Sequence, residues 1–193
     1  ADGEPVAPYR TGEPCLQDPP HSWSSSHRQF NAGANDGFCT EYADRGAENG
    51  GAEVMAYLSR EDLPFTWALA DAFTVCDAWY SSLMCGTWPN RLYAHSGTSA
   101  GKQGNSLPDD STFFTQRTIW EALSEKGVDW KYYYSDLPFI AVFENHSDPE
   151  RTVTVERFFA DVAAGELPQV CMVEPAFSYN DNHPPHHPGL GEL

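Results

Sequence analysis

A threonine at position 87 lies where the chain would present a reactive hydroxyl. It follows an apolar stretch and Gly86, and the sequence after it, WPNR at 88–91, is typical of the opening of a helix. Proline is favoured in a first helical turn because its missing N–H is not needed there, and threonine is a good N-cap. Thr87 is therefore expected beside unpaired backbone N–H groups, which bind anions and phosphate above all. The alternative is that Thr87 only caps the helix.

The segments before Thr87 predict how it is positioned. An amphipathic helix is predicted to begin at Leu63-Pro64, with its apolar residues on one face, and residues 74–80 are interpreted as a buried strand. A strand that runs into a turn whose hydroxyl opens a helix is the arrangement by which α/β enzymes present a nucleophile at the carboxyl edge of a sheet.

The second half of the chain alternates helix and strand signals. Thr118 and Glu121 have the form of a capping box, and Gly127 bounds the helix that follows them. An aromatic strand is predicted over 128–134, a helix from Thr154 to Gly165, and a short buried strand over 169–173. This order predicts a layered α/β fold with a mostly parallel sheet, in a single domain spanning residues 1–193.

Composition excludes some function classes. The formal net charge is -17 with only 11 Lys and Arg, so a nucleic-acid partner is not expected. An acidic chain that handles phosphate esters needs positive charge from another source, usually a divalent metal ion. The apolar runs are shorter than the roughly 20 residues of a membrane-spanning helix, so no transmembrane segment is expected. Residues 1–20, rich in Gly, Pro, Asp and Glu, are predicted to form an irregular arm.

The cysteines and the remaining histidines give weaker signals. Cys76 and Cys171 lie in apolar runs and are predicted to be buried thiols. Cys15 and Cys39 are the pair most readily joined by a disulfide, which the sequence does not establish. The run HPPHHP at 183–188 fits no standard metal-site spacing, so a solvated tail is favoured. His27, His95 and His146 are interpreted as surface or structural residues.

Four stretches, in this order, resemble a known family. They are HSW at 21–23 with FNAGANDGF at 30–38, LP at 63–64 with LADAFT at 69–74, CDAWYSSLMCGTWPNRLY at 76–93, and DNHPP at 181–185. Together they resemble the bacterial and fungal phosphoesterases that include the non-haemolytic phospholipases C and a group of acid phosphatases. The resemblance implies part of an alkaline-phosphatase-like α/β/α sandwich and hydrolysis of phosphoric ester bonds.

The resemblance also implies roles for individual residues. Thr87 would attack phosphorus and would coordinate a divalent metal ion, and His21 and His183 would contact the phosphoryl group and converge on Thr87. Asn182 departs from the family, which typically has an acidic residue directly before this histidine. Arg91 is expected to pair with a carboxylate and so hold the turn in shape, in preference to binding phosphate.

The remaining metal ligands are expected outside Ala1–Leu193, in a Glu-Asn pair before it and an acidic segment after it. The chain is therefore expected to be the middle part of a longer phosphoesterase domain and to be inactive when isolated. The resemblance implies a small phosphate ester or a phospholipid headgroup as substrate and a secreted or periplasmic location. The alternatives are a non-catalytic secreted ligand-binding module or an inactive remnant of the family. A sulfatase-like site is disfavoured because Cys85 lacks the C-x-P-x-R setting.

Overall fold

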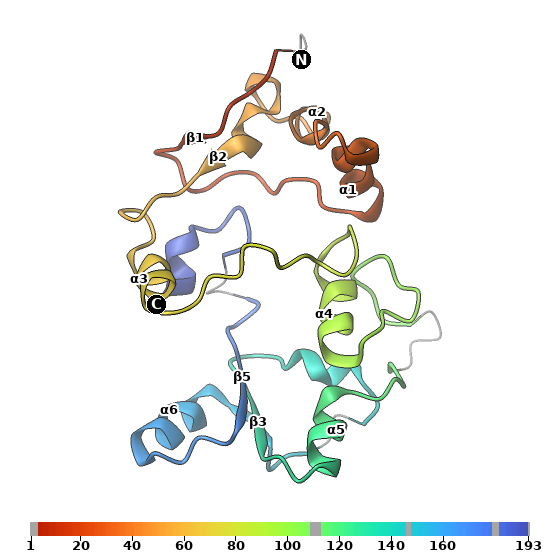
Figure 1. The fold of residues 1–193 in the computed structure, drawn as a ribbon, viewed down its shortest axis with the longest axis vertical. Coiled ribbons are helices and arrows are strands. Elements are labelled where there is room, and N and C mark those ends of the chain that lie inside the picture. The colour runs from red at the N-terminus through yellow and green to blue at the C-terminus, as the bar shows by residue number, and fades with distance from the viewer. Residues whose placement is uncertain (1–3, 109–112, 146–147, 179–181, 193) are drawn as a thin grey trace. The chain divides into compact units, whose positions relative to one another are not determined.

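The computed structural model describes residues 4–108, 113–145, 148–178 and 182–192. The chain forms two compact units, one made of Ala1–Gly86 with Asp181–Leu193 and the other of Thr87–Asn180. Each unit has its own short parallel sheet, and each is described separately below. The secondary structure of both is drawn in Figure 1.

The first unit is mainly helical. Strands β1 and β2 pair in parallel, and Ser22 begins α1 by accepting a hydrogen bond from the backbone N–H of Ser25. Arg28 of α1 makes a two-point ion pair with Glu41 of α2, at 2.5 and 2.7 Å. The elements of this unit are β1 (Tyr9–Arg10), α1 (Trp23–Phe30), η1 (Asn31–Gly33), α2 (Phe38–Ala43), η2 (Asn49–Met55), β2 (Ala56–Tyr57), α3 (Pro64–Ala72) and η4 (Pro188–Glu192).

The strand predicted over 74–80 is wrong. These residues form coil with one turn after α3, and the large side chains from Phe73 onward face solvent: Phe73 is 73% exposed, Val75 64%, Trp79 82% and Tyr80 83%. A strand needs a neighbour to satisfy its backbone N–H and C=O groups, and no strand of the described part of the chain pairs with this one. Thr87 therefore does not follow a strand.

The second unit is a layered α/β arrangement. Its three strands are parallel in the order β4-β3-β5, with Tyr132 of β3 beside Thr152 and Met172. The predicted mixture of helices with parallel strands is confirmed, and the sheet is small. The elements are α4 (Thr87–Ser96), α5 (Ile119–Glu125), β3 (Trp130–Tyr134), η3 (Phe139–Val142), β4 (Thr152–Thr154), α6 (Val155–Ala164) and β5 (Val170–Glu174).

Alternation along β3 explains the layers of the second unit. Trp130 and Tyr132 pack on Trp120 of α5, with ring centroids 5.0 and 5.5 Å apart from it. The intervening Tyr133 packs on Phe158 of α6, at 5.2 Å. Successive side chains of a strand point to opposite faces, so α5 and α6 cover opposite sides of β3, as Figure 1 shows.

Local signals for helix ends are confirmed, and the burial of two cysteines is not. Thr118 makes the predicted capping box at α5, and Gly165 ends α6 with a positive φ of 72°.

Cys76 and Cys171 are exposed, which contradicts the prediction of buried thiols. All five cysteines, including Cys15 and Cys39, are free thiols in the structure. Among the described residues, the helices all fall short of the length and apolarity needed to span a membrane.

Candidate functional site

Thr87 is exposed and is the first residue of α4, as the sequence predicts for its helix. The N–H groups of that first turn are only partly open to an anion. The N–H of Trp88 already donates to Oδ1 of Asn105 at 2.9 Å, and Pro89 has no N–H to offer. A phosphate at this turn would have to displace the Asn105 side chain, so the turn is a weaker anion site than its sequence indicates.

Arg91, one turn after Thr87, anchors α4 to the sheet. Its guanidinium pairs with the carboxylate of Glu174 at the end of β5, and Glu174 is only 2% exposed. The same carboxylate accepts hydrogen bonds from the Tyr132 hydroxyl at 2.6 Å and from the backbone N–H of Phe139 at 2.8 Å. The expected pairing of Arg91 with a carboxylate is confirmed, and it uses the charge that would otherwise attract phosphate.

His95, in the last turn of α4, is structural. It is 4% exposed, and Nε1–H of Trp120 donates to its Nδ1 at 3.0 Å. Burial lowers the pKa of His95 to about 4, and the positive charge of Arg91 acts in the same direction. The imidazole is therefore neutral at pH 7 and serves the core of the unit. His146 lies outside the described residues.

His21 and His183 meet in the first unit. Their ring centroids are 5.7 Å apart in an edge-to-face arrangement. Asp18 joins them, because its Oδ1 lies 3.3 Å from Nδ1 of His21 and 3.9 Å from Nε2 of His183. One ligand atom from each of these three residues lies within 4.8 Å of the other two, so the group is able to hold a metal ion.

Buried polar side chains fix the loop that carries Asp18 and His21. The Tyr42 hydroxyl donates to the backbone oxygen of Gln17 at 2.9 Å, and Nε2 of Gln29 donates to that of Pro20 at 2.6 Å. Tyr42 is fully buried and Gln29 is 8% exposed. This loop, which the sequence predicted to be an irregular arm, is therefore held firmly at its end.

The C-terminal segment that carries His183 is also tethered. The Glu192 carboxylate accepts hydrogen bonds from the backbone N–H groups of Thr66 at 2.8 Å and Phe65 at 3.4 Å, in the first turn of α3. These bonds lower the pKa of Glu192. Because Leu63, at the N-cap of α3, makes no side-chain cap, Glu192 supplies that function from a distant part of the sequence.

Asp18 is the residue that sequence reasoning missed. Asp18 lies in the stretch 1–20 that is predicted only as an irregular arm, although the prolines between Asp18 and His21 also hold these two residues at a fixed spacing. His21 and His183 come together, whereas Thr87 belongs to the other unit, so the convergence of all three stays a prediction. Among the described residues of the second unit, no group of three His, Cys, Asp or Glu side chains converges to hold an ion. That part of the chain alone does not fit a metal ion at Thr87.

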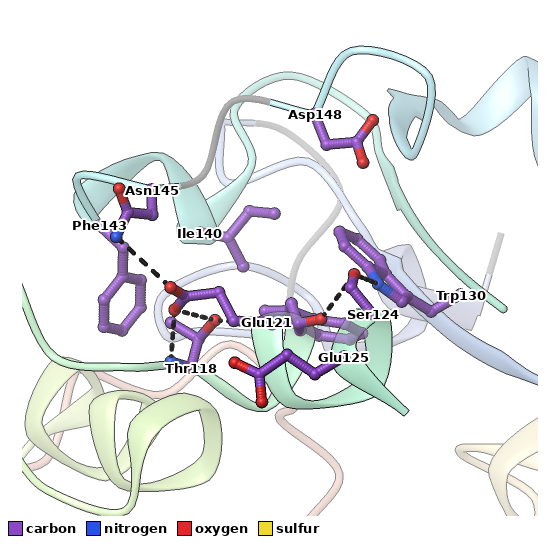
Figure 2. Close-up of a pocket in the computed structure, with 10 residues that line it drawn as sticks. Thr118, Glu121, Ser124, Glu125, Trp130, Ile140, Phe143, Asn145 and Asp148 are labelled. Carbon is purple, nitrogen blue, oxygen red and sulfur yellow. Dashed lines mark hydrogen bonds between the residues drawn. The ribbon is translucent and has the colours of Figure 1, made fainter. Parts of the chain in front are cut away.

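A pocket of about 330 Å³ opens beside α5 in the second unit (Figure 2). Its floor is apolar, with Ile140 and Phe143 among the lining residues. The polar groups at its edge serve the fold: Glu121 completes the capping box of Thr118, and the Ser124 hydroxyl accepts a hydrogen bond from Trp130 at 2.8 Å. No catalytic set is assembled by these lining residues.

Comparison with known proteins identifies the family. A family model described as the Phosphoesterase family matches residues 6–193. The chain belongs to this phosphoesterase family. It is 33% identical over 195 residues to phospholipase C A of Mycobacterium tuberculosis, an alignment that covers 87% of the chain and 37% of the relative. It is also 32% identical over 194 residues to non-specific phospholipase C1 of Arabidopsis thaliana, with 91% and 36% covered. The family resemblance of the sequence motifs is thereby confirmed.

A third relative aligns over a shorter stretch. The non-hemolytic phospholipase C of Burkholderia pseudomallei is 38% identical over 125 residues, which is 63% of the chain and 17% of that protein. The chain thus spans between about a sixth and two fifths of the length of these phospholipases C. The chain is homologous to phospholipases C, which are hydrolases, and the family match over residues 6–193 spans Thr87, His21 and His183.

Proposed function

We propose that the protein containing this chain hydrolyses a phosphoric ester of the phospholipase C type, with Thr87 as the nucleophile. The family match over residues 6–193 carries the proposal, because it includes the exposed threonine at the start of α4. The proposed substrate is a phospholipid headgroup or a small phosphate ester, and the proposed location is secreted or periplasmic. The alkaline-phosphatase-like α/β/α sandwich is likewise part of the proposal.

Thr87 needs two conditions to attack phosphorus. Its hydroxyl must be accessible and held at a defined angle, and the exposure of Thr87 together with the anchoring of α4 through Arg91 and Glu174 supports both. The hydroxyl must also lose its proton, since a neutral threonine is a poor nucleophile. A bound divalent ion would lower the pKa of the hydroxyl and balance phosphate charge. Thr87 is its proposed ligand, with further ligands beyond this chain.

His21 and His183 are the proposed contacts for the phosphoryl group. Two rings whose centroids lie 5.7 Å apart are close enough to serve one phosphoryl group. The alternatives, a non-catalytic ligand-binding module and an inactive remnant, are supported only by the small share of the relatives that this chain spans.

The test compares two proteins on p-nitrophenyl phosphorylcholine and p-nitrophenyl phosphate. One is the natural protein with its flanking sequence, and the other is the isolated 193-residue chain. We expect the natural protein with divalent metal to be active and the isolated chain to be inactive. Thr87→Ala should abolish activity, and Thr115→Ala, at another exposed threonine, should not. Activity that survives Thr87→Ala would refute the nucleophile, and activity of the isolated chain would show that it contains all the ligands.

A further inference from the structure

One carboxylate and two imidazoles in the first unit have the composition of a transition-metal site. Two ligands of one zinc ion, each about 2.1 Å from it, lie no more than about 4.2 Å apart. The ligand atoms of Asp18, His21 and His183 already lie within 4.8 Å of one another, so small side-chain rotations would complete the geometry. We infer that these three side chains bind a divalent ion of the zinc class, independently of Thr87.

The backbone selects the tautomer of His183 that such a site requires. Nδ1 of His183 lies 2.7 Å from the carbonyl oxygen of Pro184. A carbonyl oxygen only accepts, so this Nδ1 carries the proton and Nε2, the atom 3.9 Å from Oδ1 of Asp18, carries a lone pair. Metal-binding histidines commonly donate their other N–H to such an oxygen, which orients the ring.

The ligands are positioned before any ion binds. Asp18 and His21 share the loop that Gln29 and Tyr42 hold, and His183 lies on the segment that Glu192 tethers to α3. The ordering of these segments is therefore already achieved by the fold. An ion that binds pre-positioned ligands loses less affinity to conformational entropy than one that must order a flexible loop.

The charge of the group distinguishes a metal site from a site that binds phosphate directly. The carboxylate of Asp18 beside the two imidazoles attracts a cation and repels a phosphate that is not bound through a cation. Three protein ligands would leave an open position on the ion, as in catalytic zinc sites. A phosphate oxygen would bind at that position; only this last step rests on the proposed function.

The experiment uses the natural protein, stripped of metal with a chelator and titrated with Zn²⁺ in a calorimeter and with Co²⁺ by its visible absorption. Besides the ion proposed at Thr87, we expect a site that Thr87→Ala retains, so that failure of the nucleophile proposal leaves this result unchanged. Asp18→Asn, His21→Gln and His183→Gln should each weaken that site at least tenfold. His186→Gln, at a histidine of the same segment outside the group, should leave the affinity within about twofold, because the hydrogen bond described between His186 and His183 uses the backbone N–H of His186, which glutamine keeps.

Titration with inorganic phosphate in the absence of metal tests the alternative, that the two histidines bind phosphate directly. If the two histidines bind phosphate directly, Asp18→Asn removes a repelling charge and strengthens phosphate binding. Stronger phosphate binding by Asp18→Asn together with unchanged Zn²⁺ binding would overturn the metal site. Equal loss of Zn²⁺ binding in His186→Gln and His183→Gln would overturn it as well, because the ion would then be held by the histidine-rich tail.

Discussion

Replacing Glu174 with glutamine tests whether the buried carboxylate holds α4 in place. The carboxylate accepts from the Arg91 guanidinium, the Tyr132 hydroxyl and the backbone N–H of Phe139. Glutamine removes the charge and turns one acceptor into an NH₂ donor, which would face groups that are donors themselves. Arg91 would then be a half-buried cation without its partner. Breaking a buried ion pair by changing one member costs about 3–5 kcal/mol.

Denaturation by urea measures this cost. With a slope of about 2 kcal/mol per molar urea, a loss of about 3–4 kcal/mol lowers the midpoint by about 1.5–2 M. Glu166→Gln is the matched control, because Glu166 is exposed and the one hydrogen bond described for it uses its backbone N–H. That variant is expected to stay within about 0.5 kcal/mol of the natural protein.

A double-mutant cycle separates the energy of the Arg91–Glu174 ion pair from what each side chain contributes by itself. Arg91→Met with Glu174→Gln removes both charges, so the double variant should be more stable than the sum of the single losses indicates, by about 1–3 kcal/mol. A Glu174→Gln midpoint equal to that of Glu166→Gln would refute the reasoning. Strict additivity in the cycle would show that Arg91 and Glu174 contribute independently and that the helix is held by other contacts.

Two further predictions concern stability. Burial keeps His95 neutral with a pKa of about 4 against an ordinary value of 6.5, so only the unfolded chain takes up this proton between those values. The free energy of unfolding should therefore keep its full value above pH 6.5 and fall by about 3 kcal/mol as the pH drops to 4. In urea titrations at different pH values, His95→Gln should lack this part of the pH dependence. Gly51→Ala should unfold at clearly lower urea, because its new Cβ would lie 2.1 Å from the backbone oxygen of Cys39. Gly46→Ala, also at positive φ but with no atom within 4 Å, should cost only about 1–2 kcal/mol, and equal losses in the two variants would contradict the clash.

Elements with local determinants were the ones that could be predicted from the sequence. The capping box at Thr118 and the left-handed Gly165 lie within one turn of the helices they bound, and both are confirmed. The aromatic alternation of β3 likewise reflects its own two faces. The segment at 74–80 has the composition of a strand, but strand formation depends on a distant neighbour that its own residues do not encode.

The candidate site also has one part that local sequence predicts and another that depends on residues far apart in the chain. The start of α4 at Thr87 follows from a local proline signal, whereas the meeting of His21 with His183 depends on chain segments far apart in sequence. Only the family resemblance indicated that these histidines act together. Asp18 gave no signal as a ligand until the fold placed it beside both of them. The convergence of these groups with Thr87 stays a prediction.

The pairing of the arginines supports the proposal that a metal ion supplies the positive charge for phosphate binding. The chain has 11 Lys and Arg against 28 Asp and Glu. The arginines that form ion pairs with carboxylates in the described structure are Arg10, Arg28, Arg60, Arg91, Arg117, Arg151 and Arg157. At the Thr87 turn, Asn105 already accepts the Trp88 N–H. Among the described residues a phosphate group thus meets few arginines outside ion pairs, which supports the proposal that a bound metal ion balances its negative charge. Phosphate binding to the natural protein should therefore require added divalent metal; metal-independent binding would show that the protein supplies the positive charge itself.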